Sequence, residues 1–178
     1  MRKLNIEELH RLSVDEFKQA DKIPLVVVLD DIRSMYNVGS IFRTSDAYRV
    51  ECIYLCGITG CPPHAEIHKT ALGAEESVEW MHFDDVIEAV ADLKKRGYLL
   101  LAVEQAEGSI TFPLPEEIIN SDVSGYAIIL GNEVKGVKQT VIDECDACIE
   151  LPQYGTKHSL NVSTAAGIVI WEAFKVLS

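Results

Sequence analysis

An asparagine, a glycine and an arginine stand at spacings that could bind an anion in the stretch NVGSIFRTSD, residues 37–46. We expect Asn37 to cap a helix and to accept hydrogen bonds from its free backbone N–H groups. The apolar residues of this helix share one face: Val38, Ile41 and Phe42. Because a helical side chain leans back over the preceding turn, Arg43 would reach across Gly39 on the opposite face. The bare glycine then leaves room for an anion or a phosphate, although an ordinary amphipathic helix with a solvated arginine shows the same pattern.

Two further loops carry glycines and polar side chains. GNEVKGV, residues 131–137, places Glu133 between two glycines, and its spacing matches neither a GxGxxG nor a Walker loop. PQYGTKHSLNVS, residues 152–163, sets polar residues at alternate positions before the last helix, where their oxygens can cap it: Ser159, Asn161 and Ser163. Since all three loops follow apolar runs, and ligands of open α/β sheets bind outside the carboxyl ends of strands, the loops can converge on one pocket.

Short apolar runs and helical patterns alternate along the chain. Runs without polar alternation are typical of strands buried on both faces of a parallel sheet. These runs cover residues 24–30, 51–57, 98–105, 125–131 and 147–153. Further helical patterns cover residues 4–12, 84–97 and 162–177. The alternation predicts an α/β fold, a mostly parallel sheet with helices on both faces, in which residues 1–23 are a helical extension and residues 24–178 the functional domain.

The last helix is apolar nearly all round. One stripe is formed by small and β-branched residues: Val162, Ala165, Ala166, Val169, Ala173 and Val176. Larger apolar residues lie away from its centre: Ile168, Trp171 and Phe174. Such a helix is buried on more than one side. In a small domain another subunit can supply the second covering surface, so we expect a symmetric dimer; a core helix buried within its own chain is the alternative.

The composition is that of one globular domain. The chain has 178 residues, of which 48% are hydrophobic and 25% charged, and no apolar run nears the ~20 residues of a membrane span. The N-terminus has acidic residues where a signal peptide would be apolar, so we expect a cytoplasmic protein. The net charge of −12 argues against a nucleic-acid partner unless basic residues gather locally. The candidates for such a surface are Arg33, Arg43, Arg49, Lys69, Lys135, Lys138, Lys157 and His158.

The five cysteines predict neither a disulfide framework nor a metal site. They are an odd number, Cys52, Cys56, Cys61, Cys145 and Cys148, and three of them stand in apolar surroundings typical of reduced buried thiols. The pair Cys145 and Cys148 has no second half that would complete a zinc site. A second candidate set, Cys56 and Cys61 with His64 and His68, is interrupted by Pro62 and Pro63.

Taken together and in order, the three loops resemble motifs of a known family. N-x-G-x-x-x-R (37–43), ILGNEVKG (129–136) and LPQYGTKHSLNVSTAAG (151–167) look like those of the SpoU, or TrmH-type, RNA 2′-O-ribose methyltransferases of the SPOUT superfamily. HKTALGAEE (68–76) is similar to a further segment of the family, and the resemblance spans residues 24 to about 176. One departure is Leu-Pro-Gln at 151–153, where the family commonly has Ile-Pro-Met, which alters the side chains that line a cofactor.

The resemblance implies a homodimer whose C-terminal part is threaded into a trefoil knot that binds S-adenosylmethionine. Gly131, Leu151 and Leu160 fall where the loops of the family hold the cofactor, largely through backbone groups. Their expected neighbours at the cofactor are Asn132 and Ser159. The end of a strand, Val103 and Glu104, would border the adenosine.

The active-site positions of the family fall on Asn37, Arg43, Glu133 and Asn161. Because a guanidinium has a pKa above 12, we expect Arg43 to bind an RNA phosphate and to stabilise charge on the ribose oxygen rather than to act as a base. In the family this arginine can come from the partner subunit. The two asparagines would position the ribose or Arg43, and Glu133 would order its loop.

The resemblance predicts methyl transfer to a ribose 2′-hydroxyl of tRNA or rRNA. We expect tRNA rather than rRNA, because only about 23 residues precede the first strand and leave no room for a separate RNA-binding domain. The negative net charge permits a helper protein that presents the RNA to the enzyme. Neither DNA nor a membrane is an expected partner. Alternatives are a base-modifying methyltransferase of the superfamily and a non-catalytic RNA-binding dimer of the same fold. A nucleotide-binding oxidoreductase would lack its glycine fingerprint here.

Overall fold

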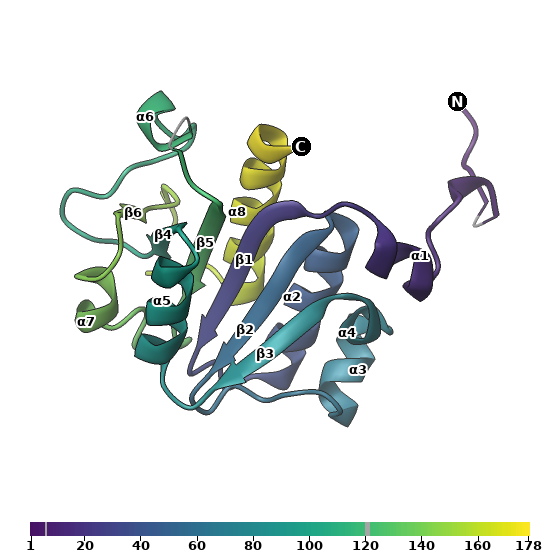
Figure 1. Cartoon of the computed structure of the whole chain (residues 1–178), viewed down its shortest axis with the longest axis horizontal. Coiled ribbons are helices and arrows are strands. Elements are labelled where there is room, and N and C mark those ends of the chain that lie inside the picture. Colours follow the sequence, from purple (N-terminus) through teal and green to yellow (C-terminus); the bar gives the residue numbers. More distant parts are fainter. Residues whose placement is uncertain (6, 120–121) are drawn as a thin grey trace.

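A parallel sheet forms the centre of the molecule, with helices on both faces (Figure 1). The computed structural model describes residues 1–5, 7–119 and 122–178, in which the strand order is β3-β2-β1-β5-β4-β6 and every pairing is parallel. The strands are β1 (Ile23–Asp30), β2 (Val50–Cys56), β3 (Glu79–Phe83), β4 (Tyr98–Val103), β5 (Gly125–Leu130) and β6 (Ala147–Ile149). Each predicted apolar run contains a strand, and the predicted α/β class is confirmed.

Two layers of helices bury the two faces of the sheet. The helices are α1 (Val14–Gln19), α2 (Met35–Ala47), α3 (Ala65–Ala71), α4 (Ala74–Ser77), α5 (Val86–Lys95), α6 (Glu116–Ile119), α7 (Gln139–Ile142) and α8 (Val162–Leu177). Leu25, Val27 and Leu29 point into a core with α2 and α8, whereas Val26 and Val28 point into a core with α5 and α7. All five side chains are fully buried, which explains why β1 reads as a continuous apolar run.

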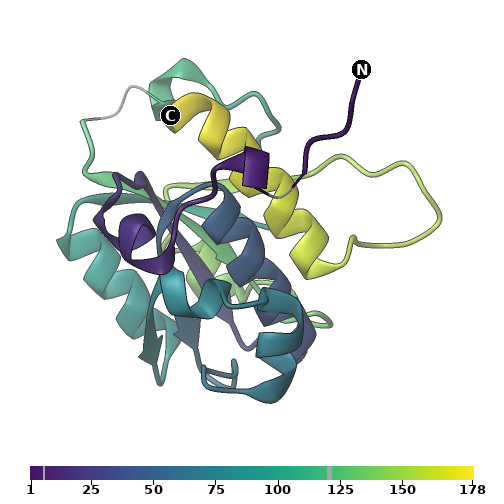
Figure 2. The same cartoon turned by 90° about the vertical axis from the view of Figure 1, so that its right-hand side faces the viewer.

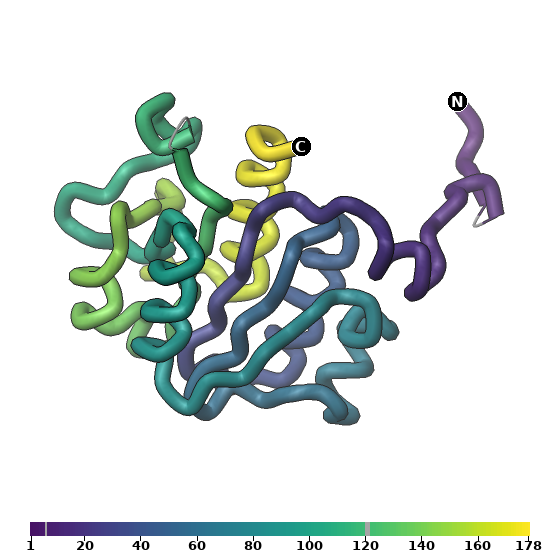
Figure 3. Tube along the Cα trace, in the orientation of Figure 1, coloured from purple at the N-terminus to yellow at the C-terminus, as the bar shows by residue number. Residues whose placement is uncertain are grey.

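The order of the strands reverses between β1 and β5. The trace in Figure 3 runs from β1 outward to β2 and β3, and then crosses to β4 on the other side of β1. β5 returns to pair with β1, from Leu25 opposite Tyr126 to Leu29 opposite Leu130. Ligands of open α/β sheets bind at such a reversal, beyond the carboxyl ends of the strands. The fold therefore places the candidate site at the ends of β1 and β5.

The prediction of a helix over residues 4–12 is wrong. That stretch holds only a 3-10 turn at Glu7–Leu9, with Ile6 outside the described residues, and the first α-helix begins at Val14. Ser13 caps α1 by a capping box: its hydroxyl accepts from the backbone N–H of Glu16, 3.3 Å away, and its own N–H donates to the Glu16 carboxylate, 2.8 Å away. The motif Ser-x-x-Glu at 13–16 is the signal that the apolar periodicity upstream concealed.

The edge strand β3 was not among the predicted runs. It pairs only with β2 among the described strands, and none of its residues is buried. Met81 is 47% exposed, and Glu79 and His82 are exposed beside it. A strand that is buried on neither face lacks the apolar run by which the central strands were recognised.

Helix α8 is buried on one face and exposes apolar side chains on another. Ala166, Val169, Ile170 and Ala173 are the buried positions. Apolar side chains on the rest of its surface are exposed by 39% to 43%: Ile168, Trp171 and Val176. The alternative that α8 is a core helix within its own chain is therefore wrong, because a single chain leaves this surface uncovered. No helix in the described part of the chain is long and apolar enough to cross a bilayer.

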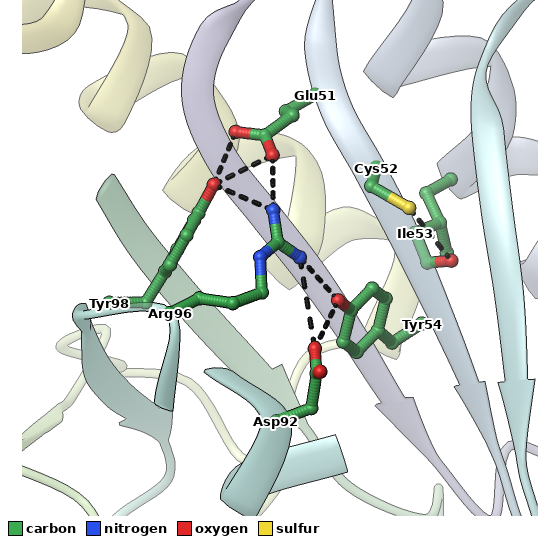
Figure 4. A network of polar contacts seen from close by, with 7 residues as sticks. All are labelled: Glu51, Cys52, Ile53, Tyr54, Asp92, Arg96 and Tyr98. Carbon is green, nitrogen blue, oxygen red and sulfur yellow. Dashed lines mark hydrogen bonds and ion pairs between the residues drawn. The ribbon is translucent and has the colours of Figure 1, made fainter. Parts of the chain in front are cut away.

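A network of charged and phenolic groups fastens the end of α5 to the amino-terminal edge of the sheet (Figure 4). The Arg96 guanidinium donates to the Glu51 carboxylate, 2.7 Å away, and to the hydroxyl of the buried Tyr54. The Tyr54 hydroxyl donates to Asp92 at 2.7 Å, and the Tyr98 hydroxyl donates to Glu51 at 2.6 Å. Burial, and then the hydrogen bond to Glu51, raises the pKa of Tyr98 to about 12. The network lies at the opposite edge from the carboxyl ends of the strands, so we assign it to stability.

Replacing Arg96 by alanine removes the cation that these groups share. We expect the free energy of unfolding, measured by urea denaturation, to fall by about 1–3 kcal/mol, the range for leaving polar groups without their partners. Lys95→Ala, one residue away and exposed, is the matched control and should change stability by less than about 0.5 kcal/mol. Equal stability of the two variants would contradict a role for the network.

Candidate active site

Glu133 holds two loops together at the ends of β1 and β5. Its carboxylate accepts hydrogen bonds from the backbone N–H groups of Arg33 and Ser34, both at 2.9 Å. A third bond comes from the side-chain amide of Asn37, 3.1 Å away. Burial alone would raise the pKa of Glu133, but the hydrogen bonds from these groups outweigh it and lower the pKa below its usual 4.5. The carboxylate is therefore charged at neutral pH, beside the positive end of α2.

Asn37 does not cap α2, contrary to the prediction. The cap is Ser34, whose hydroxyl accepts from the backbone N–H of Asn37, 3.3 Å away. Asn37 thus lies in the first turn, 9% exposed, and its side chain is free for other partners. Its Nδ2 donates to Glu133, and its Oδ1 accepts from Nδ2 of Asn161, 3.1 Å away. Asn37 therefore joins the β5 loop to the start of α8.

Asn161 caps α8, as capping oxygens before the last helix predicted. Its Oδ1 accepts from the backbone N–H of Ser163 at 2.8 Å and from the Ser163 hydroxyl at 2.6 Å. Its Nδ2 remains to donate to Asn37. Asn161, Asn37 and Glu133 therefore form one chain of hydrogen bonds, from residues that are 124 and 96 positions apart in the sequence. We call these three residues the polar triad.

Gly39 makes room for a helix and not for an anion. A Cβ at this position would collide with the hydroxyl of Thr70 and with the carbonyl oxygen of Ile67, both on α3. The Thr70 hydroxyl also donates to the backbone carbonyl of Tyr36, 3.0 Å away. The predicted space beside Gly39 is filled because α3 packs directly on the backbone of α2.

Arg43 lies outside the polar triad. It is exposed, six residues after Asn37 and so about 9 Å further along α2. It lines an open groove of about 610 Å³ between α2, α3 and α8, together with Lys69 and Gly167. Within the described residues its guanidinium makes no hydrogen bond or ion pair. A single chain thus brings together three of the four predicted active-site residues and leaves the fourth apart.

The loop after β5 is folded tightly on itself. A Cβ on Gly131 would collide with the backbone of Gly136 and Val137, so this close approach requires glycine. Gly136 has a φ of +67° and lies against the Glu104 carboxylate, which accepts from the backbone N–H of Val137 at 2.9 Å. Glu104, at the end of β4, therefore supports this loop directly. Val103 is the last residue of β4 and is partly buried.

The side chain of Asn132 is used by backbone groups of its own loop and of the loop after β1. Its Nδ2 donates to the carbonyl oxygen of Asp31 at 2.7 Å, and its Oδ1 accepts from the N–H of Val134 at 3.0 Å and of Lys135 at 3.1 Å. Its backbone carbonyl oxygen accepts from the N–H of Gly136, 2.8 Å away, so Asn132 orders the loop and does not present its side chain to a ligand.

The loop between β6 and α8 stands away from the body of the molecule (Figure 2). Leu151 packs against the core at its start, whereas Ser159 and Leu160 are exposed near its end. Gln105 reaches this loop: its Nε2 donates to the carbonyl oxygen of His158, 2.8 Å away. The predicted cofactor residues of this loop thus follow β6 at the same edge of the sheet as Gly131, and within the described residues none of them forms a hydrogen bond to Gly131.

Sequence reasoning missed an ion-pair cluster beside the triad. The ammonium of Lys138 lies 2.8 Å from the Asp31 carboxylate and 3.3 Å from that of Asp30, which is 1% exposed. Burial raises the pKa of Asp30, whereas the hydrogen bond from Lys138 lowers the pKa of Asp31. Lys138 was counted toward a basic surface, but its charge is neutralised here. The signal was the pair of acids at the very end of the first apolar run.

The cysteine and histidine sets of the sequence do not converge in the structure. Cys145 and Cys148 each direct their thiols at backbone carbonyl oxygens, those of Val141 and Glu104. His64 caps α3 through Nδ1. Among the residues with described positions, no group of three His, Cys, Asp or Glu side chains could hold a metal ion.

The fold and the triad define an α/β protein with its site at the strand reversal, and comparison with known proteins assigns the family. Residues 24–171 match the model of the SpoU rRNA Methylase family, so the chain belongs to that family and the resemblance is confirmed. The chain is 28% identical over 170 residues to a 23S rRNA (guanosine-2′-O-)-methyltransferase RlmB of Vibrio parahaemolyticus. That match covers 95% of this chain and 66% of the relative. The chain therefore spans less than two thirds of the curated relative that it matches.

Solved structures of the family share the fold. An AdoMet-bound rRNA methyltransferase from Sinorhizobium meliloti has a TM-score of 0.79 and 25% identity, over 91% of this chain and 60% of that one. The A. aeolicus TrmH/SpoU tRNA modifying enzyme has a TM-score of 0.76 and 25% identity, over 91% of this chain and 81% of that one. The trefoil knot stays a prediction of the family resemblance.

The lowered pKa of Glu133 predicts how its contribution to stability varies with pH. Above the usual pKa of 4.5 the charged carboxylate stabilises the fold fully, and this stabilisation is lost as the pH falls through the lower folded-state pKa. Glu133→Gln should therefore have a lower Tm than wild type at neutral pH, and the difference should shrink as the pH drops below about 4.5. The measurement is thermal unfolding across this pH range. Glu117→Gln, at an exposed position, is the control; a difference in Tm that stayed constant for Glu133→Gln would refute the assignment.

Proposed function

We propose that this chain is an S-adenosylmethionine-dependent RNA methyltransferase that acts on a ribose 2′-hydroxyl. The observation that carries the proposal is the polar triad, in which Asn37, Glu133 and Asn161 meet from three separate segments at the strand reversal. Capping and core packing do not require this arrangement. Family membership and the named activity of the RlmB relative support it. We take residues 24–178 as the catalytic domain, residues 1–23 as an extension, and the cytoplasm as its location.

The loops around the triad fit a nucleoside cofactor. Gly131 and Leu151 offer backbone groups and apolar surface just after β5 and β6, and Leu160 is exposed near the end of the loop that Leu151 begins. The Asn132 side chain is committed to backbone groups of the neighbouring loops, and Ser159 is exposed. These are the groups that hold an adenosine by its edges and faces rather than by charge. When bound, S-adenosylmethionine would supply an electrophilic methyl group.

Arg43 would reach the reaction from a partner subunit. Its groove also includes Gly167 of α8, and the uncovered apolar side chains Ile168 and Trp171 follow directly on that helix. A second copy packed on this surface would lie beside Arg43 and bring its own polar triad near the guanidinium. We therefore propose a homodimer with composite pockets, each with Arg43 from one subunit and the triad from the other.

In such a pocket the two asparagines, the arginine and the glutamate have separate tasks. Asn37 and Asn161 would orient the ribose so that its 2′-oxygen lies in line with the methyl group. Arg43 would bind the adjacent phosphate and stabilise negative charge on that oxygen, while the proton leaves to phosphate or water. Glu133 is committed to backbone N–H groups and would hold the loops, because a carboxylate free to face the phosphate would repel it.

We propose tRNA as the substrate in preference to rRNA. The A. aeolicus tRNA modifying enzyme is matched over 81% of its chain, compared with 60% for the S. meliloti rRNA methyltransferase. The RlmB relative, by its name, acts on 23S rRNA. Mapping of 2′-O-methyl positions in RNA from cells with and without this gene distinguishes the two substrates.

The activity itself is tested with methyl-labelled S-adenosylmethionine and total RNA, followed by digestion to nucleosides. Label in 2′-O-methyl nucleosides supports the proposal. Label in methylated bases would indicate a base-modifying enzyme, and RNA binding without label would indicate a non-catalytic RNA-binding dimer; either result overturns the proposal.

Two variants separate the roles of arginine and asparagine. Arg43→Ala should lower the rate of methyl transfer by more than about a hundredfold, the cost of removing a group that stabilises the transition state, and leave cofactor affinity almost unchanged. Asn161→Ala should weaken both, since Asn161 lies between the ribose and the cofactor loops. Cofactor affinity is measured by calorimetry and transfer by label. Equal loss of cofactor affinity in both variants would show that this division of roles is wrong.

A mixture of the same two variants tests the composite pocket. When Arg43→Ala and Asn161→Ala chains are co-expressed, half of the dimers combine the two, and each such dimer has one pocket with an intact arginine and an intact triad. About a quarter of the wild-type activity should return, well above the reduced activity of either variant alone. No recovery would mean that Arg43 serves its own subunit or that the chains do not pair.

A further inference from the structure

The groove that contains Arg43 carries a second cation, Lys69. Lys69 is an exposed residue of α3 and lines the same groove of about 610 Å³. Four hydroxyl-bearing residues line the groove together with the two cations: Ser40, Thr44, Tyr48 and Thr70. The groove is distinct from the polar triad, and none of the cofactor-loop residues lines it.

The packing of α3 on α2 fixes Lys69 relative to Arg43. Gly39 lets the backbone of α3 approach that of α2, and the Thr70 hydroxyl donates across this contact to the carbonyl oxygen of Tyr36, 3.0 Å away. Lys69 immediately precedes Thr70 on α3. Its Cα is therefore held on one wall of the groove while Arg43 rises from the other, so the two charges are presented together.

The groove is locally cationic on an acidic protein. No residue that lines it within the described part of the chain carries a carboxylate. Arg43 also lines a second hollow with Asp46 and Glu76, where the Asp46 carboxylate accepts from the Ser77 hydroxyl at 2.6 Å, and Glu75 pairs with His68. Two cations that form no ion pair within the described residues match the repeated single charges of a nucleic-acid backbone better than a single compact anion.

We propose that Lys69 binds an RNA phosphate in this groove, next to the phosphate held by Arg43, so that the groove carries the substrate strand toward the reacting ribose. The inference deepens the proposed function and rests on it for the identity of the polymer. Lys69 is a substrate-binding residue in this scheme, with no part in methyl transfer itself. The occupant is thus an RNA strand, and its recognition here is by charge and independent of sequence.

Direct binding tests the inference without relying on catalysis. The probe is a fluorescein-labelled single-stranded RNA of mixed sequence, and its Kd is measured by anisotropy at several KCl concentrations. Lys69→Ala should weaken binding roughly fivefold to tenfold at low salt and reduce the slope of log K against log salt by about 0.7, the value for one phosphate contact on a single strand. Lys69→Arg should keep wild-type affinity. Lys95→Ala removes the same charge from the exposed surface of α5, on the other face of the sheet. It should leave the slope of log K against log salt unchanged.

The outcomes separate this inference from the proposed activity. If Lys69→Ala and Lys95→Ala weaken binding equally, or if the wild-type protein does not bind the RNA, Lys69 has no special role and the inference is overturned. Methyl transfer is measured on the same preparations. Transfer by the wild type with unchanged affinity of Lys69→Ala would overturn the RNA groove alone, whereas RNA binding that depends on Lys69 without methyl transfer would overturn the proposed activity alone.

Discussion

The negative charge of Glu133 is the constraint on which the rest of the site depends. The chain must turn sharply from β1 into α2, and the backbone N–H groups of Arg33 and Ser34 in this turn have the Glu133 carboxylate as their acceptor. Because Glu133 belongs to the loop after β5, one side chain satisfies the start of a helix about 100 residues away and locks two loops at the strand reversal. The same carboxylate orients Asn37, and through it Asn161.

Helix α2 carries most of the functional geometry because each of its faces meets a different neighbour. Its apolar face packs on the sheet, Asn37 in its first turn meets the β5 loop and α8, Gly39 meets α3, and Arg43 faces the groove. The spacing N-x-G-x-x-x-R therefore has a physical meaning at each of its fixed positions. A shift of one residue would rotate each side chain by about 100° and break all three contacts at once.

The sequence predicted the features that depend on local pattern and missed those that depend on distant partners. Strands buried on both faces, such as β1, are visible as apolar runs, and the cap at Asn161 is visible from its type and position. Asn37 was misplaced as a cap because Ser34 also has a capping side chain, and only the position of Glu133, nearly 100 residues away, shows which residue is free. Gly39 was read as open space since the sequence does not reveal that α3 returns to that face. Lys138 looked solvated until the fold placed it on Asp30 and Asp31.

The acidic total of the chain and its proposed RNA substrate are compatible because electrostatic interactions in salt are short-ranged. At physiological ionic strength charges separated by more than about 8 Å are largely screened, so a phosphate in the groove responds to Arg43 and Lys69 and hardly to acids elsewhere on the surface. Glu75 is paired with His68, and Lys138 is neutralised beside the triad and so does not draw RNA onto the loops. The net charge of −12 then acts mainly on the rate of encounter, whereas the arrangement of a few cations on α2 and α3 determines where an RNA strand can rest.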